Sequence, residues 1–250
     1  MRSKVDVRQL TKSYLSAEGE VRAVDGVSFS VGDGEFVAIV GPSGCGKSTL
    51  VNVLAGFLRP DHGAVLVDGV EVTGASASRI LISQQGSVFP WLTVRENLTF
   101  GIRDLPHVDQ TELAFHYSSL VGLLGFEDCY PHELSGGMVR RAELARALVM
   151  KPDILLMDEP FSGLDALMTL RMRNEVLRIL AEERHTVLSI THDVEEAIHM
   201  ADRVIVLSSR PAKVQAVFEV PLPRPRNLTS PEVQELRVRI LAELGVGRSE

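Results

Sequence analysis

One short pattern, G-x-x-x-x-G-K-[ST], is matched by Gly41, Pro42, Ser43, Gly44, Cys45, Gly46, Lys47 and Ser48. The apolar run 36–40 before it predicts a buried strand, and the apolar-periodic segment 50–54 after it predicts a helix. Glycines let the loop curl until successive N–H groups and the positive end of the helix face one anion. A chance glycine-rich turn would not explain both flanks, so the sequence predicts a loop that binds nucleotide phosphates.

Two side chains of this loop carry distinct chemistry. Lys47 supplies a mobile cation for the outer phosphates, and the hydroxyl of Ser48 is placed to bind Mg²⁺. Thr49, the next residue, is also expected to contact ATP.

The bulk composition narrows the setting of this chemistry. A net charge of −7 argues against nucleic acid as the main partner. Two cysteines, Cys45 and Cys129, favour a reducing compartment over a disulfide framework. No apolar signal region and no run of eighteen apolar residues occurs, so we expect any membrane role to come through a partner.

Strands alternate with helices along most of the chain, which predicts an α/β fold with a mainly parallel sheet. Antiparallel strands are expected near the N-terminus, where 27–31 alternates between apolar residues and serine. We expect one domain, 1–250. Its nucleotide-binding core is 1–91 with 154–220, its helical insertion 92–153, and its tail and last helix 221–250. Within the insertion, Thr93 and Glu96 have the spacing of a helix capping box, and periodicity predicts a helix over 111–124. Ser230 is expected to cap the last helix, with Pro231 at its first position.

Two carboxylates, Asp158 and Glu159, close the apolar strand predicted at 154–157. A charged group at the end of a buried strand is costly unless an opposite charge, a hydrogen-bond donor or a metal ion compensates it. In a phosphate-loop protein the first acid holds Mg²⁺ through water and the second activates the attacking water. Gln84 and His192 also end predicted strands, and we expect Gln84 to reach the metal or the water and His192 to read the γ-phosphate.

A second anion-binding nest is predicted at Ser135, Gly136 and Gly137, which open a helical run. This nest has no lysine and no metal ligand, so it is half of a site. One complete loop and one incomplete nest are explained if two copies pair head to tail, each nest closing the ATP of the other subunit.

The candidate motifs follow one another along the chain in the order 41–48, Gln84, 134–138, 154–159, 162–165 and His192. In this order they make the chain resemble the ATP-binding-cassette (ABC) ATPases over nearly its whole length. The resemblance implies that Tyr14 stacks on adenine, although an ordinary core tyrosine is the alternative. It also implies that Asp165 communicates across the dimer interface.

A narrower resemblance, to the ATPase subunits of nitrate, sulfonate and taurine importers, rests on 89–94, 158–161, 164–167, 209–211 and 222–226. It implies permease subunits, a solute-binding protein and a peripheral place on the cytoplasmic face of the cell membrane. Val139-Arg140-Arg141 departs from the usual Arg-Gln-Arg, and Ser162-Gly163 from the frequent Gly-Ala. The alternatives are an exporter or lipid-extraction ATPase and a non-transport cassette ATPase acting on DNA or ribosomes.

The run 88–92 contains the only tryptophan, Trp91, beside Phe89 and Pro90. Pro90 makes a helix or strand interior unfavourable because it removes a backbone donor. Either Trp91 fills the core of the insertion, or Phe89 and Trp91 line a groove that receives a permease helix.

Overall fold

The structure is a computed structural model that describes residues 3–16, 19–84, 86–183 and 185–246. Its contacts divide the chain into two compact units. The first comprises Met1–Ser76, Leu156–Glu159 and His185–Glu250, and the second comprises Ala77–Leu155 and Pro160–Arg184.

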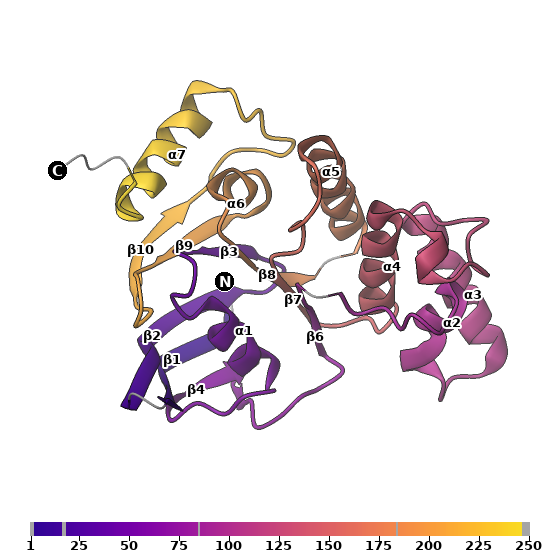
Figure 1. The fold of residues 1–250 in the computed structure, drawn as a ribbon, viewed down its shortest axis with the longest axis horizontal. Helices are drawn as coiled ribbons and strands as arrows, with labels where there is room; N and C mark the ends of the chain where they lie inside the picture. The colour runs from indigo at the N-terminus through magenta and orange to yellow at the C-terminus, as the bar shows by residue number, and fades with distance from the viewer. Residues whose placement is uncertain (1–2, 17–18, 85, 184, 247–250) are drawn as a thin grey trace. The chain divides into compact units, whose positions relative to one another are not determined.

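A mainly parallel sheet forms the centre of the first unit (Figure 1). Its middle strand β3 (Phe36–Val40) pairs in parallel with β8 (Thr186–Thr191) and β9 (Arg203–Leu207). The edge strand β10 (Val214–Glu219) runs antiparallel to β9, and the end of β7 (Ile154–Asp158) lies beyond β8. Every residue of β3 and β8 is buried, as expected for parallel strands covered on both faces.

Helices α1 (Lys47–Ala55) and α6 (Val194–Met200) lie on opposite sides of this sheet (Figure 1). Each follows a central strand, α1 after β3 and α6 after β8. The carboxyl ends of these parallel strands therefore lead into the N-termini of both helices, which is where α/β sheets bind ligands.

An antiparallel sheet completes the first unit, in the order β2-β1-β4-β5. The strands are β1 (Ser3–Ser16), β2 (Gly19–Gly32), β4 (His62–Val67) and β5 (Val70–Glu71). Val27, Phe29 and Val31 are buried while Ser28 and Ser30 are exposed, which confirms the predicted alternation.

The tail of the first unit is fixed by a buried arginine. The guanidinium of Arg226, 7% exposed, donates hydrogen bonds to the carbonyls of Ile198 (2.7 Å), Ala201 (2.5 Å) and Val220 (3.0 Å). The last carbonyls of a helix lack partners within it, so Arg226 caps α6. Burial lowers the pKa of Arg226 to about 10. The final helix α7 (Pro231–Glu243) begins as predicted, because Ser230 accepts a hydrogen bond from Val233 N.

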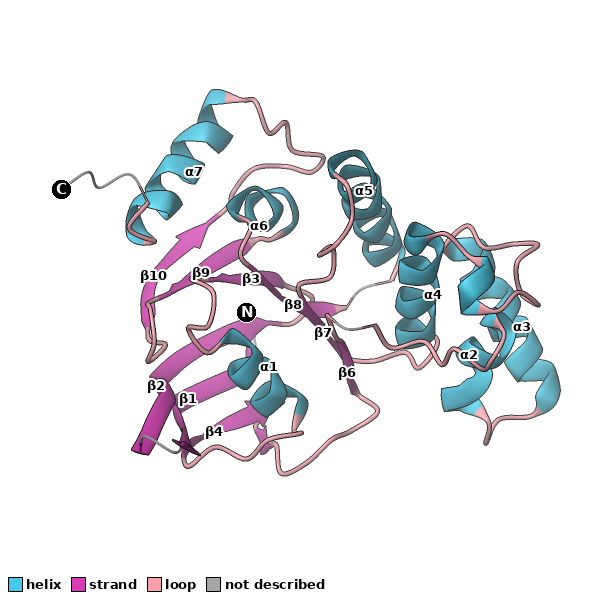
Figure 2. Ribbon diagram, viewed as in Figure 1, coloured by secondary structure: helices cyan, strands magenta, loops and turns pink. Residues whose placement is uncertain are grey.

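The second unit is mostly helical (Figure 2). It contains β6 (Arg79–Ile82), the start of β7, and the helices α2 (Val94–Thr99), α3 (His107–Leu120), α4 (Gly136–Leu148) and α5 (Ala166–Glu182), with single 3₁₀ turns at Phe100–Ile102 and Pro131–Glu133. The predicted capping box is present, since Thr93 and Glu96 each bond the backbone of the other.

The helix predicted at 111–124 is shifted in the structure. Helix α3 begins four residues earlier, after Pro106, and ends at Leu120. Gly122 adopts a left-handed φ of 65°, which an α-helix cannot continue through. The apolar residues 121–124 belong to the turn after the helix, so the prediction of their helicity was wrong.

Candidate active site

The loop 41–46 joins β3 to α1 in the first unit. Gly46 has a left-handed φ of 124°, and a Cβ there would lie 2.5 Å from the carbonyl oxygen of Ala23. Only glycine fits this position, because any other side chain would collide with backbone. The prediction of a strand, a loop and a helix at this point is confirmed.

The side chain of Lys47 lies across the loop rather than in solvent. Its residue is 6% exposed, and Nζ donates to the carbonyls of Gly41 (2.8 Å) and Pro42 (3.0 Å). The loop backbone therefore holds the ammonium group in place. Cys45 is also buried, and burial raises the pKa of its thiol. Ser48 is exposed at the first turn of α1, and Thr49 is half-buried.

Asp158, the last residue of β7, lies beside this loop and accepts a hydrogen bond from the Ser48 hydroxyl. Burial raises the pKa of the Asp158 carboxyl, and the charge of Glu159 acts in the same direction. The Ser48 hydrogen bond and the charge of Lys47 oppose the shift. The carboxylate is thus only partly compensated by the groups around it.

The next residue, Glu159, adopts a left-handed φ of 47° that is unusual for a residue with a side chain. Its N–H donates to Ile190 O at 2.8 Å, which keeps the backbone against β8. Its carboxylate oxygen Oε1 lies 3.1 Å from Nδ1 of His192, which follows β8. The structure therefore brings two of the predicted site residues into direct contact.

Tyr14 lies on β1 with 43% of its surface exposed, so it is not a core tyrosine. Its hydroxyl is 3.2 Å from Oγ1 of Thr49, on the first turn of α1. An exposed aromatic ring therefore flanks the loop that would hold the phosphates.

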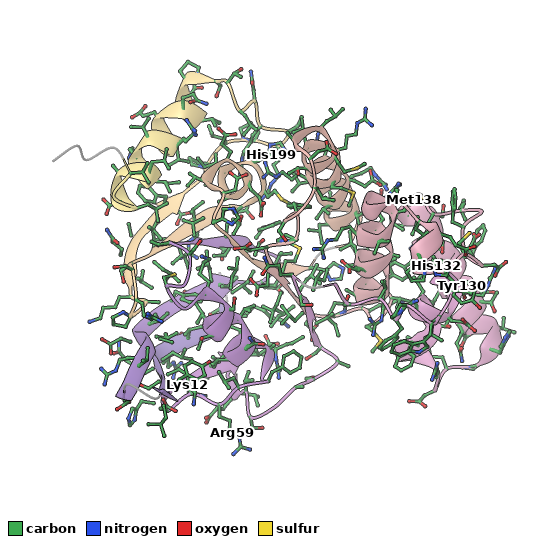
Figure 3. All side chains as sticks on the ribbon, viewed as in Figure 1. Lys12, Arg59, Tyr130, His132, Met138 and His199 are labelled. Carbon is green, nitrogen blue, oxygen red and sulfur yellow. The ribbon has the colours of Figure 1, made fainter. Side chains whose placement is uncertain are left out.

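The remaining predicted residues belong to the second unit. Ser135 caps α4 by accepting a hydrogen bond from N of Met138, a residue labelled in Figure 3, at 3.3 Å. Asp165 caps α5 in the same way, through Met168 N at 2.9 Å. The carbonyl of Gln84 accepts from Arg140 Nη2 at 3.0 Å. Gly136 opens α4, and Gly137 is buried.

Two functional candidates were missed from the sequence. Arg140 and Glu143 of α4 both contact residues that follow β6, since Arg140 donates to Ser83 O and Glu143 accepts from Ser87 N. The unusual sequence at 139–141 was a signal that could have drawn attention to Arg140. Nothing in the sequence indicated what Arg140 would contact.

Comparison with known families gives a match to the ABC transporter family model over residues 24–162. This stretch is more than half of the chain and includes the loop, Gln84, the nest and both carboxylates. The chain belongs to the ABC transporter family.

Similar ABC proteins match nearly end to end. An uncharacterized ABC transporter ATP-binding protein of Methanocaldococcus jannaschii is 44% identical over 243 residues, covering 96% of this chain and 91% of the relative. The aliphatic sulfonates import ATP-binding protein SsuB of Bacillus cereus is 36% identical over 245 residues, covering 97% and 96%.

Solved ABC cassettes share the fold. A dimeric bacterial ABC transporter cassette aligns with a TM-score of 0.77 at 27% identity, covering 88% of this chain and all of the other. A dimeric post-hydrolysis state bound to ADP and phosphate aligns at 0.75 and 26%. These matches confirm the predicted phosphate-loop NTPase fold, and the chain is an ATP-binding subunit with ATPase activity. None of the described helices is long and apolar enough to cross a membrane.

The raised pKa of Asp158 in this ABC ATPase gives a stability prediction. A carboxyl whose pKa is higher in the folded chain favours folding below its unfolded value, near 3.8, and loses that contribution as pH rises through the folded pKa. Asp158→Asn removes the charge and keeps an acceptor for Ser48. We expect the nucleotide-free variant to melt at a higher temperature than the wild type at pH 7.5, with a smaller gain at pH 4.5, and to lose ATPase activity.

Calorimetry at both pH values, with Asp128→Asn as the control, checks this. The Asp128 side chain is 85% exposed, so its change is expected to stay within about 0.5 kcal/mol. A wild type more stable than Asp158→Asn at pH 7.5 would show that the carboxylate is compensated within the free protein.

Proposed function

We propose that this ABC ATPase works as a head-to-tail dimer that drives import of a small oxyanion or organic solute through separate permease subunits. The observation that carries the proposal is the division of anion-binding parts. The loop with Lys47 belongs to one unit, and the nest at Ser135, which has neither a lysine nor a metal ligand of its own, belongs to the other. The similarity to a sulfonate import protein favours nitrate, sulfonate or taurine-type solutes.

Magnesium fits the groups beside the loop. Among the described residues, no cluster of three or more histidine, cysteine or acidic side chains could hold a metal alone. Mg²⁺ is typically bound by one or two protein oxygens together with substrate phosphates and water. Ser48 and Asp158, already hydrogen-bonded to each other, would supply those oxygens, with Gln84 as a further candidate. When bound, the ion neutralises charge on the phosphates.

The chain's own residues divide the remaining work. Lys47 binds the outer phosphates, and Tyr14 stacks on adenine. Glu159 takes the proton from the attacking water, and His192 holds the Glu159 carboxylate through the 3.1 Å contact while it reads the γ-phosphate.

Ser135, Gly136 and Gly137 would close the partner's ATP, and Asp165 would transmit its state across the interface. The whole chain would be one ATPase domain. Its nucleotide core would be 1–91 and 154–220, its helical part 92–153, and its tail 221–250. The dimer would sit on the cytoplasmic face of the membrane, where the permease and a solute-binding protein complete the importer.

The permease contact is proposed at a cavity of about 230 Å³ in the second unit, lined by Ile80, Leu81, Ile82, Ser87, Phe100, Gly101, Glu143, Arg146, Ala147 and Met150. Phe89 lies beside it, with its ring centroid 4.5 Å from that of Phe100 and 5.4 Å from that of Trp91. Trp91 is 69% exposed, so the alternative that it fills the core of the helical part is wrong. Exposed aromatic anchors beside a cavity suit a protein partner.

We expect Trp91→Ser to leave the isolated subunit folded and active as an ATPase, because the ring contributes little to the core. Assembly with the permease and solute uptake in reconstituted vesicles should fall sharply, since a central aromatic anchor typically contributes 2 kcal/mol or more, about 30-fold in affinity.

Phe115→Ser is the matched control, because Phe115 is 60% exposed in the same unit and lies on α3. Unchanged permease assembly and uptake with Trp91→Ser would contradict the docking site. Uptake assays with labelled nitrate, sulfonate and taurine then test the solute class.

A further inference from the structure

A buried ion pair on α4 links this helix to residues 83, 84, 86 and 87, which follow β6 and form the Gln84 segment. The carboxylate of Glu143, a residue 1% exposed, accepts from Arg140 Nη1 at 2.6 Å. Its other oxygen accepts from Ser87 N at 2.9 Å. Charge buried to this degree is retained only with full hydrogen bonding, which the backbone N–H of Ser87 helps to provide.

Arg140 makes the second half of the tie. Its guanidinium donates to two carbonyls of the same segment, that of Ser83 at 3.4 Å and that of Gln84 at 3.0 Å. Gly86 lets the chain approach closely, because a Cβ there would lie 2.8 Å from Oε1 of Glu143. The Gln84 segment is therefore held at three backbone groups by two side chains of one helix.

The same helix carries the nest. Ser135 caps α4, Arg140 lies on its second turn and Glu143 about one turn further. The forked guanidinium of Arg140 reaches two carbonyls and a carboxylate, which neither an amide nor an ammonium group at this position could do. Glu143 also lines the cavity of the proposed permease contact.

We propose that Arg140 and Glu143 are positioning residues that couple the Gln84 segment to the nest, so that nucleotide sensed at one site sets the nest presented to the other. This inference rests on the proposed paired-site function. Neither residue would contact the nucleotide itself. They act by moving the Gln84 backbone and α4 as one body.

The test is steady-state ATPase kinetics of Arg140→Met with Glu143→Gln, which removes both charges together and leaves an amide oxygen for Ser87 N. We expect ATP binding by the monomer to stay within about twofold, because the loop and Tyr14 lie in the other unit. The Hill coefficient for ATP should fall toward one, and kcat should fall about tenfold. Lost stability alone would not lower the Hill coefficient.

Arg141→Met is the matched control, since Arg141 lies on the same helix and donates to the carbonyls of Val121 and Gly122, both at 3.2 Å. Its melting temperature should fall without a change in the Hill coefficient. If the double variant does not fold, Arg140→Lys keeps the charge beside Glu143 but cannot hold both carbonyls, and its Hill coefficient should still fall.

Wild-type cooperativity that survives in the folded double variant, or in Arg140→Lys, would overturn the coupling role alone. An equal loss of cooperativity in Arg141→Met would also overturn it. A wild-type Hill coefficient of one would instead contradict the paired-site function on which this inference rests.

Discussion

Lys47→Ala should weaken ATP binding and reduce turnover strongly. The ammonium group is the cation that the loop itself holds, through Gly41 O and Pro42 O, where the outer phosphates would lie. Charge-assisted hydrogen bonds contribute about 1.5–3 kcal/mol, so ATP affinity should fall roughly 10–100-fold. Loss of a preorganised donor to the transition state should lower kcat by about 10²–10³-fold.

Fluorescent-nucleotide titration and phosphate release measure the two effects. The control is Lys213→Ala, because the Lys213 side chain is 60% exposed and its ion pair with Asp25 is at the surface. Near-normal ATPase in Lys47→Ala would remove the assignment of the phosphate site.

Glu159→Gln should hydrolyse ATP about 10²–10⁴-fold more slowly while still binding it. The amide keeps the size of the side chain and a contact to His192 Nδ1, but it cannot take a proton from water. Because the bound ATP persists, the variant should accumulate as an ATP-locked dimer in size-exclusion chromatography with Mg²⁺.

The matched control is Glu219→Gln, because the Glu219 side chain is 72% exposed and lies at the edge strand β10. It should turn over ATP as the wild type does and should not accumulate as a dimer. Glu159→Gln that hydrolyses at the wild-type rate would show that another group is the base.

Local patterns predicted much of this fold. The continuous apolar runs 36–40 and 154–157 predicted the buried strands β3 and β7, and the caps at Thr93 and Ser230 were predictable because capping depends on a few adjacent residues. The end of α3 was not predictable in this way. The apolar residues after Leu120 continue the helical periodicity in the sequence, although the chain turns at Gly122.

Contacts between distant residues were beyond such patterns. His192 and Glu159 are 33 positions apart, and their 3.1 Å contact exists only because β8 and β7 are neighbours. Nothing in the local sequence indicates that Glu143 is buried. It can be buried because Arg140 and Ser87 N donate hydrogen bonds to its carboxylate. Arg226 is buried for the same reason, through the carbonyls at the end of α6.

Mixing the variants Lys47→Ala and Ser135→Arg tests whether two copies share each ATP site head to tail. Lys47→Ala lacks the loop cation but keeps the nest, whereas Ser135→Arg blocks the nest but keeps the loop. In a head-to-tail dimer each homodimer has no complete site, and the heterodimer has one site with both parts intact. We expect the mixture to regain ATPase activity that neither variant shows alone. A mixture as inactive as its components, or full activity of Ser135→Arg by itself, would contradict the account.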